Sequence, residues 1–238
     1  MSAPAPLVVT GGSDPVIEAR EVVVSFGETP ALRGASLSVR RGELLAVMGP
    51  SGSGKSTLLH CMAGILVPRS GEVYFEGRRI DTMREQERST LRRDHFGFVF
   101  QFGQLVPELS AEENVALPLL LGGMRHEQAM EKAREWFDRL DLKGLERHRT
   151  GEMSGGQAQR VALARALVAN PAVLFADEPT GSLDSLNGEI VMELLVRSAR
   201  EAGTTVILVT HEPRVAIYAD REVVVRDGTV ASQEGVPR

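Results

Sequence analysis

The stretch "ELLAVMGPSGSGKSTLLHCMAG", residues 43–64, changes from a continuous apolar run through a glycine-rich turn to a helical pattern that stops at Gly64. This succession predicts a buried strand, a loop and a helix. Within it, "GPSGSGKS" (49–56) has a glycine at each end of four intervening residues, followed by Lys and Ser, which is the full pattern of a phosphate-binding loop. The glycines let backbone N–H groups turn inward around phosphate oxygens, and the helix start adds the positive end of its dipole. We therefore expect a nucleotide-binding site here.

The side chains of this loop have expected roles of their own. Lys55 would reach the β- and γ-phosphates of the nucleotide, and Ser56 would offer its hydroxyl to Mg²⁺. A glycine-rich turn with a solvated lysine is the alternative, and the strand before and the helix after argue against it. The residues of the loop expected to bind the nucleotide are Gly49, Pro50, Ser51, Gly52, Ser53, Gly54, Lys55, Ser56 and Thr57.

A second stretch, "VLFADEPTGS" (173–182), runs four apolar residues into two adjacent acids, Asp177 and Glu178. A parallel strand delivers ligands at its carboxyl end, so both acids would lie at the sheet edge that holds the phosphate loop. Asp177 would hold Mg²⁺ through its water shell, and Glu178 would polarise the water that attacks the γ-phosphate. By itself the acid pair could equally be a strand cap or the acids of a helix start, and it is the phosphate loop upstream that favours catalysis.

The bulk composition narrows the class of protein. A chain of 238 residues with 42% hydrophobic and 25% charged residues is an ordinary soluble globular protein that can bury a substantial core. Its net charge of −5 gives no general basic face, so nucleic acid is not an expected partner. Cys61 is the single cysteine, which excludes an intramolecular disulfide and fits a small core residue in a reducing compartment.

No membrane span or signal peptide is expected. The longest apolar stretch, "VALPLLLGGM" (115–124), is interrupted by Pro118 and two glycines, and it is shorter than the roughly 20 residues of a membrane-spanning helix. The start, "MSAPAPLVVTGGSD", lacks a cationic segment followed by a clear apolar core, and residues 1–14 are expected to form a flexible tail.

The pattern along the chain predicts an α/β fold with a mostly parallel sheet as its phosphate-loop NTPase core. The first 80 residues are strand-rich and predict an N-terminal antiparallel β-subdomain. Residues of about 104–168 are mostly helical and predict an inserted α-helical subdomain. Strand patterns at "AVLFAD", "TTVILVTH" and "REVVVRDG", with a helical pattern between the first two, predict a parallel sheet covered by helices. The domain is expected over residues 15–230, followed by a tail at 231–238.

A further helix start, "MSGGQAQR" (153–160), places Ser154, Gly155 and Gly156 at the beginning of the longest clear helical pattern. Free N–H donors and a hydroxyl at such a position make a second ready-made anion site. An ordinary serine N-cap followed by glycines is the alternative.

Taken together, these motifs make the sequence similar to the ATP-binding-cassette ATPase family, from about Val16 to Val230. The family signature corresponds to "MSGGQ", with Met153 where leucine is more usual. In that family two cassettes pair head to tail, and the signature of one closes over the ATP held by the other. The resemblance therefore implies a dimer with a second copy of this chain, in which Ser154, Gly155, Gly156 and Gln157 contact the partner's ATP.

The resemblance implies roles for three more residues around the nucleotide. Gln101, in "FGFVFQFGQL", matches the glutamine that contacts Mg²⁺ and water and links the core to the helical lobe, although a surface glutamine ending a strand is the alternative. His211, after "TVILVT", matches the switch histidine that holds Glu178 and the attacking water in line. Phe26 stands where an aromatic residue stacks on adenine, with core packing as its alternative.

The loop "GSLD" (181–184) matches the family segment that crosses the dimer interface, which places Ser182 and Asp184 near the partner's site. Asp184 could otherwise be a plain helix cap. The other histidines, His60, His95, His126 and His148, have no metal-ligand spacing and receive no role. The basic run "LRRDH" (91–95) is interpreted as a solvated or coupling surface.

The stretches "GFVFQFGQLVPELSAEENVALPLLLGG" and "ADEPTGSLDS" resemble the lipoprotein-releasing, macrolide-efflux and antimicrobial-peptide-resistance group. That resemblance implies separate integral membrane permease subunits as partners and a peripheral place on the cytoplasmic face of the membrane. The ATPase would then power export, extraction or mechanical transmission. Two alternatives stay open: a cell-division-type regulatory ATPase coupled to cell-wall hydrolases, and a soluble cassette protein acting on DNA or ribosomes.

Overall fold

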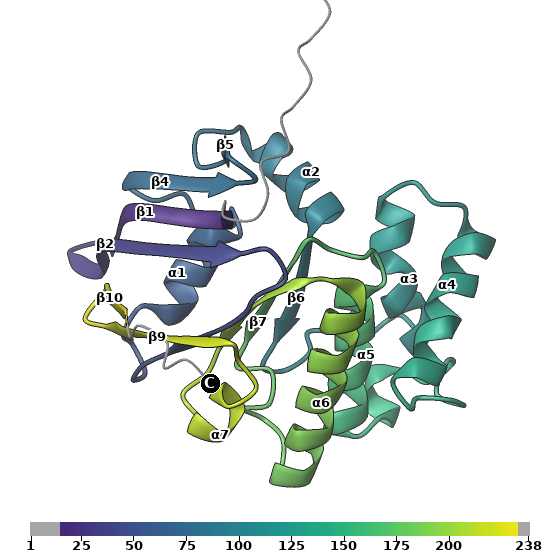
Figure 1. The fold of residues 1–238 in the computed structure, drawn as a ribbon. Helices are drawn as coiled ribbons and strands as arrows, with labels where there is room; N and C mark the ends of the chain where they lie inside the picture. Colours follow the sequence, from purple (N-terminus) through teal and green to yellow (C-terminus); the bar gives the residue numbers. More distant parts are fainter. Residues whose placement is uncertain (1–14, 233–238) are drawn as a thin grey trace, which may run out of the picture.

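The computed structural model describes residues 15–232, which form two β-sheets and a group of helices (Figure 1). The sequence assigns tails to residues 1–14 and 231–238. Of these, residues 1–14 and 233–238 lie outside the described part, whereas Ala231 and Ser232 lie within it. These two residues belong to strand β10, so the tail expected from residue 231 is corrected: the folded domain continues to Ser232, because Ser232 pairs with Val223.

The first sheet is antiparallel and N-terminal, as the strand-rich pattern predicts. Its strands lie in the order β2-β1-β4-β5. Their bounds are β1 Pro15–Phe26, β2 Thr29–Arg40, β4 Ser70–Phe75 and β5 Arg78–Arg79.

The second sheet is mostly parallel, also as predicted, with the order β10-β9-β3-β8-β7-β6. Its strands are β3 Leu44–Met48, β6 Phe96–Phe100, β7 Val173–Asp177, β8 Thr205–Val209, β9 Arg221–Arg226 and β10 Thr229–Ser232. Only the β9–β10 pair is antiparallel within this sheet of the described chain. The runs "LLAVM", "VLFAD" and "TVILV" are apolar almost throughout because strands of a covered parallel sheet are buried on both faces.

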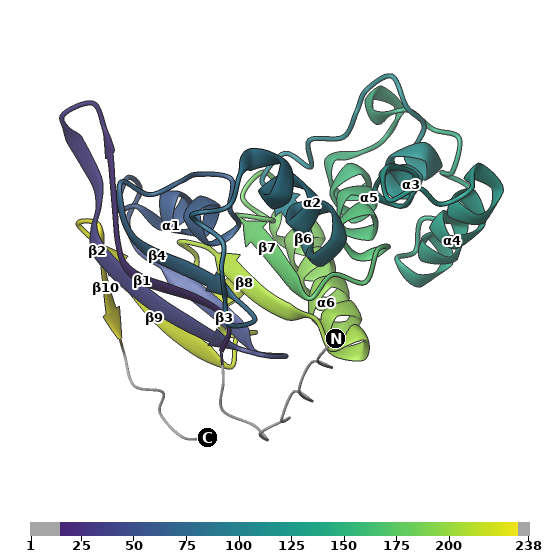
Figure 2. The same ribbon diagram turned by 90° about the horizontal axis from the view of Figure 1, so that it is seen from above.

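Helix α1 (Lys55–Met62) lies between the two sheets, and its Leu58, Leu59 and Met62 join a buried cluster with residues of both. Figure 2 shows the first sheet stacked over β9, β3 and β8, with the other helices to one side. The start of α1 is therefore fixed from two directions by packed apolar side chains. This packing holds the phosphate loop, which directly precedes α1, in place.

The opposite face of the parallel sheet carries a second buried cluster with the helices α3 (Ala111–Leu121), α4 (His126–Arg139), α5 (Gly155–Leu167) and α6 (Ser185–Ala202). The side chains expected on one face of the 126–139 helix are all buried: Ala129, Ala133, Trp136, Phe137 and Leu140. A short 3-10 turn (Thr150–Glu152) precedes α5, and α7 (Pro213–Ala216) follows β8. None of the helices within residues 15–232 combines the length and the apolar character needed to cross a membrane.

Helix α2 (Glu85–His95) is an element that the sequence does not predict. It buries none of its residues, so its sequence carries no apolar period, and it contains the basic run 91–95. Its charged residues pair instead: Glu85 bonds Arg88 at 2.7 Å and Arg92 at 2.6 Å. Arg92 also donates to the carbonyl of Gly64 at 2.6 Å, which ties α2 to the end of the α1 segment.

Candidate active site

The phosphate loop joins β3 to α1, and two of its glycines sit where no other residue fits. Gly49 has φ 145°, and a Cβ there would lie 2.2 Å from the carbonyl oxygen of Val225. Gly54 has φ 105°, and its Cβ would lie 2.6 Å from the carbonyl oxygen of Ala31. Left-handed backbone and close approach together demand glycine at both positions. The loop is thus held tightly between β2 and β9.

Lys55 is buried, with 5% of its surface exposed, and its ammonium donates to the carbonyls of Gly49 and Pro50, both at 2.9 Å. The loop carbonyls thus hold the cation beside the turn rather than in solvent. The hydroxyl of Ser53 is buried and has no hydrogen-bond partner among the described residues. The loop thus contains a buried hydroxyl without a partner and a buried ammonium. Both groups can donate hydrogen bonds to the oxygen atoms of bound phosphates.

Asp177, at the end of β7, faces the first turn of α1. The hydroxyl of Ser56 donates to its Oδ1 at 3.1 Å. Burial raises the pKa of Asp177, and the Ser56 hydrogen bond and nearby positive charge partly oppose that shift. No group of three or more His, Cys, Asp or Glu side chains that could hold a metal is present in the described chain. One carboxylate and one hydroxyl suit Mg²⁺, which takes few protein ligands and completes its shell with water and phosphate oxygens.

Glu178 follows directly and has a left-handed backbone, φ 47°, which is uncommon for a residue other than glycine. Its N–H donates to the carbonyl of Val209 at 2.9 Å, which anchors the turn on the neighbouring strand β8. Its Oε1 lies 3.0 Å from Nδ1 of His211, the residue expected to hold it in line. Strained backbone of this kind gathers at functional sites.

Gln101 follows β6, the strand beside β7, and its side chain reaches the same place as Glu178. A Cβ on Gly181 would lie 2.9 Å from Nε2 of Gln101 and 3.3 Å from Oε2 of Glu178. The two side chains therefore converge over Gly181, where an added Cβ would push the end of the Gln101 side chain aside. The alternative of a free surface glutamine does not describe this geometry.

A cavity of about 450 Å³ opens where these strand ends meet the phosphate loop. It is lined by Ser51, Gly52, Lys55, Ser56, His60, Phe100, Gln101, Phe102, Gln104, Asp177 and Glu178. His60, to which the sequence gives no role, lies here, and its electrostatic effect lowers the pKa of Asp177 against the larger effect of burial. Its spacing of four residues from Ser56 on α1 is the signal that could have placed it on this face.

The residues of the 153–157 signature segment lie outside this cavity. Ser154 is the N-cap of α5: its hydroxyl accepts from the N–H of Gln157 at 3.2 Å, and the Gln157 side chain accepts from the N–H of Ser154 at 2.8 Å. Gly156 faces Asn187 of α6, where an added Cβ would lie 2.6 Å from Oδ1. None of residues 153–157 lines the cavity. In one chain the segment is a capping box, and contact with a nucleotide would need another molecule.

The 181–184 loop is likewise tied down within the chain. Asp184 is the N-cap of α6, accepting from the N–H of Asn187 at 3.0 Å and from its side chain at 2.6 Å. Backbone hydrogen bonding from Asn187 lowers the pKa of Asp184. Ser182 donates to the carbonyl of Gln101 at 2.6 Å. Asp184 thus has the helix-cap role that the sequence leaves open, beside an exposed turn.

Phe26, at the end of β1, is 59% exposed, so core packing does not account for it. The β2 residue Ala31 packs against Gly54, which brings this hairpin against the phosphate loop. An exposed aromatic ring on that hairpin is available for stacking on a base.

A phosphate loop on one strand end, with an acid pair, a histidine and a glutamine on its neighbours, defines a nucleotide-hydrolysing cassette of the phosphate-loop class. The family model described as "ABC transporter" matches residues 32–181. The chain therefore belongs to the ABC transporter family, as an ATP-binding subunit with ATPase activity.

Similar proteins narrow the group. The chain is 47% identical over 188 residues to the lipoprotein-releasing system ATP-binding protein LolD of Psychrobacter arcticus, covering 77% of this chain and 82% of that protein. It is 45% identical over 193 residues to the macrolide export ATP-binding/permease protein MacB of Chromobacterium violaceum, covering 81% of this chain but 30% of that longer protein. A dimeric structure of the ATP-binding cassette MJ0796 in a post-hydrolysis state, bound to ADP and Pi, superposes with a TM-score of 0.83 at 38% identity, covering 92% of this chain and all 100% of that one.

Proposed function

We propose that Glu178 positions and polarises the water that attacks the γ-phosphate of ATP, with His211 and Gln101 holding it in place. The observation that carries this proposal is the convergence of the phosphate loop, Asp177 and Glu178 on one cavity. The 3.0 Å contact between Glu178 and His211 orients the carboxylate, and Gln101 lies against the same turn. Lys55 would bind the β- and γ-phosphates, since phosphoryl transfer is mostly positioning and charge neutralisation.

Mg²⁺ fits the same proposal. Ser56 and Asp177 would hold the ion, with Gln101 completing the protein's share of its ligands. When bound, Mg²⁺ neutralises the negative charge of the β- and γ-phosphates. Phe26 would stack on the adenine ring.

We further propose that the working unit is a head-to-tail dimer of this chain. Ser154, Gly155, Gly156 and Gln157 lie outside the cavity of their own chain, so a second copy is needed to bring them to ATP. The start of a thirteen-residue helix offers N–H donors and a favourable dipole for a phosphate anion. Asp184 and Ser182 would lie close to the partner's site. The dimeric MJ0796 cassette supports this arrangement as that of a similar protein.

Separate membrane permease subunits complete the proposal. The names of the similar proteins describe lipoprotein release and macrolide export, and MacB carries its permease within the same chain. We place this chain on the cytoplasmic face of the membrane, bound through such subunits. It would power export, extraction or mechanical transmission.

The catalytic assignment is tested by Glu178→Gln. The variant should bind ATP with parental affinity, because the phosphate loop is unchanged, while the ATPase rate falls by about a hundredfold or more. Glu222→Gln, on the exposed side of β9, is the matched control and should keep the parental rate. Equal turnover by Glu178→Gln and the parent protein would remove Glu178 from catalysis.

The partner assignment is tested with the same variant. Tagged Glu178→Gln protein is purified with ATP from detergent-solubilised membranes, and the proteins that accompany it are identified by mass spectrometry. A multi-span permease with a large extracytoplasmic domain is the expected result. A partner that acts on cell-wall hydrolases would favour the regulatory alternative, and ribosomal or DNA-associated proteins alone would overturn the membrane assignment.

A further inference from the structure

Gln159 is a buried polar residue of α5, 2% exposed, that does not line the nucleotide cavity. Its side-chain Nε2 donates to two backbone carbonyls, that of Phe100 at 2.8 Å and that of Pro179 at 2.7 Å. Both donor positions of the amide are thus used. A buried amide with two short bonds to distant segments fixes those segments relative to each other.

The two carbonyls belong to the ends of neighbouring strands. Phe100 is the last residue of β6 and pairs with Asp177, the last residue of β7. The chain continues from Phe100 into Gln101, and from Asp177 through Glu178 into Pro179. Gln159 therefore links the last residue of β6 to Pro179, which lies beyond the end of β7, where the sheet no longer holds the chain.

The bridge supports the strained turn at Glu178. The left-handed conformation at φ 47° persists only where its surroundings hold it. The N–H of Glu178 bonds Val209 at 2.9 Å, and its carbonyl accepts from the N–H of Gly181 at 3.0 Å. The bond from Gln159 to Pro179 fixes the residue directly after Glu178, which is the remaining side of the turn.

The same helix also holds the Gln101 loop. Gly103 has φ 67°, and a Cβ there would lie 3.3 Å from Oε1 of Gln159, so the loop passes directly over this side chain. Arg165, less than two turns further along α5, donates to the carbonyls of Gly103 at 2.8 Å and Gln104 at 2.9 Å. Helix α5 thus fixes the loop at Phe100 and again at residues 103–104.

We propose that Gln159 is a positioning residue for ATP hydrolysis, which sets the separation of Gln101 and Glu178 and links both to the signature helix. The proposal rests on the functions proposed above for Gln101 and Glu178. Helix α5 begins at the residues proposed to meet the partner's ATP and carries Gln159 one turn later. A shift of α5 on dimer closure therefore reaches both side chains that hold the attacking water.

The first test is Gln159→Met, which keeps the length of the side chain and removes both donors. The dissociation constant for ATP should stay within about twofold of the parent, while kcat falls about tenfold or more. Asn114→Leu is the matched control: Asn114 is 1% exposed and donates to the carbonyls of Val106 and Ser110, both at 3.0 Å, within the α3 region. It should lower the melting temperature and leave kcat near the parental value.

A double-mutant cycle separates positioning from general destabilisation. If Gln159 acts through Gln101, the variant Gln159→Met/Gln101→Ala should lose less kcat than the product of the two single losses. The proposal would be overturned if the two losses multiplied, or if Gln159→Met kept the parental kcat. It would also be overturned if Gln159→Met and Asn114→Leu lost kcat in proportion to their losses of melting temperature, because kcat would then report stability alone. Should Gln159→Met not fold, Gln159→Leu, which also removes both donors and adds no charge, undergoes the same measurements.

Glu178→Gln, measured alongside, tells the two proposals apart. If it loses turnover while Gln159→Met keeps it, the role of Gln159 falls and the catalytic assignment stands. If Glu178→Gln hydrolyses ATP at the parental rate, the catalytic assignment falls and the role of Gln159 falls with it.

Discussion

Gly54 and Cys61 lie on the same loop-and-helix segment, and each is constrained by what surrounds it rather than by its own chemistry. The space beside Gly54 is filled by the backbone of β2, with the carbonyl oxygen of Ala31 2.6 Å from where a Cβ would stand. Cys61 is buried behind the loop, 1% exposed, against apolar side chains. The packing around each position can therefore be tested by one small change, which is an added methyl group at Gly54 and reaction of the thiol at Cys61.

Gly54→Ala should abolish ATP binding and lower stability by several kcal/mol, because the added methyl group meets backbone that cannot move aside. Gly77→Ala is the matched control, since Gly77 also has a positive φ, 75°, but nothing lies within 4 Å of its Cβ position. That control should cost only about 1–2 kcal/mol and keep parental ATP affinity. Titration with a fluorescent ATP analogue and thermal unfolding of both variants give the comparison.

The thiol of Cys61 should be inert in the folded protein. Burial raises its pKa to about 12, so almost no thiolate is present at pH 8. We expect labelling by a thiol-reactive disulfide reagent to be slow under native conditions and fast in denaturant. Rapid native labelling would show that the core around α1 opens far more readily than its packing indicates.

At the scale of elements, the helices α3 and α5 start in the same way but lie in different places. Ser110 and Ser154 each form a capping box, with their hydroxyls accepting from the N–H of Glu113 and Gln157 respectively. The two caps contribute similarly to helix stability. Of these two helix starts, only that of α5 is proposed to meet a nucleotide.

This pair allows stability and function to be separated. Ser110→Ala and Ser154→Ala should each lower the free energy of unfolding by about 1 kcal/mol through loss of the cap. ATPase turnover should fall only in Ser154→Ala. Measuring denaturant unfolding and steady-state hydrolysis on both variants decides the matter, and equal losses of turnover would make Ser154 a cap and nothing more.

Whether an element could be predicted from the sequence depended on how much apolar surface that element buries. Strands β3, β7 and β8 and helices α4 to α6 were readable from sequence, because continuous apolar runs or a helical period mark buried faces. Helix α2 has no apolar face and was not readable. The cavity residues that belong to a recognisable motif could be predicted. His60 could not, because a single histidine forms no sequence motif. The bridge of Gln159 was not predictable either, because its carbonyl partners are backbone atoms that any sequence supplies.

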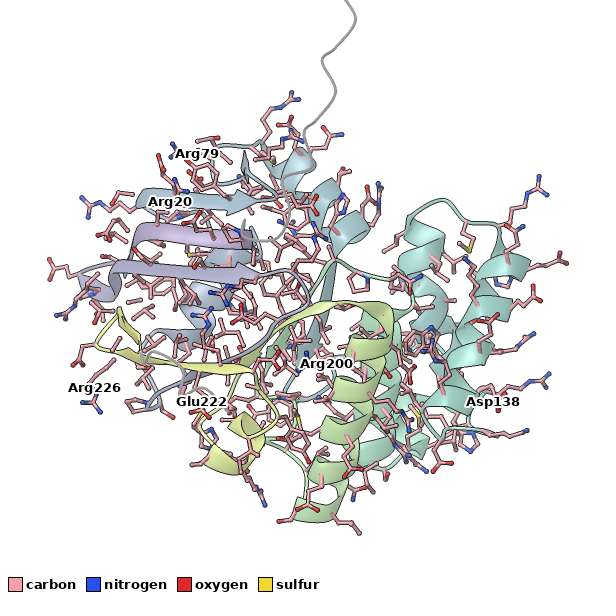
Figure 3. The ribbon with its side chains drawn as sticks, in the orientation of Figure 1. Arg20, Arg79, Asp138, Arg200, Glu222 and Arg226 are labelled. Carbon is pink, nitrogen blue, oxygen red and sulfur yellow. The ribbon has the colours of Figure 1, made fainter. Side chains whose placement is uncertain are left out.

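At the scale of the whole molecule, Asp220 joins three parts of the chain. Its Oδ2 accepts from the N–H of Leu44 on β3 at 2.8 Å, and its Oδ1 accepts from Arg200 of α6, which Figure 3 labels near the end of that helix. Burial tends to raise the pKa of Asp220, but the hydrogen bonds from Arg200 and Leu44 outweigh it, so that the pKa is lowered.

A lowered folded-state pKa means that the charged carboxylate stabilises the fold above the unfolded pKa of about 3.9 and loses this effect as pH falls through the folded pKa. Asp220→Asn should therefore be less stable than the parent at neutral pH, with a difference that shrinks in acid below about pH 4. Thermal unfolding across pH tests this. Asp138→Asn, at an exposed position on α4, is the control and should keep a melting temperature close to that of the parent at neutral pH.

Two copies of the molecule give the remaining prediction. Ser154→Arg should leave ATP binding by the single chain intact, because Ser154 does not line the cavity, and should block closure of the dimer. In a Glu178→Gln background, light scattering after size exclusion should show an ATP-dependent dimer for Ser154 and a monomer for Ser154→Arg. A persisting ATP-dependent dimer would contradict the head-to-tail arrangement.

The turn between β9 and β10 touches the phosphate loop directly: the N–H of Gly228 donates to the carbonyl of Ser53 at 3.0 Å, and Gly228 accepts from the N–H of Arg33 at 2.8 Å. On the same side of the loop, the carbonyl oxygen of Val225 on β9 packs against Gly49. The β9–β10 hairpin and the phosphate loop are far apart in the chain, so this part of the nucleotide pocket exists only after a long-range contact has formed, and denaturation that detaches the hairpin should remove ATP binding along with it.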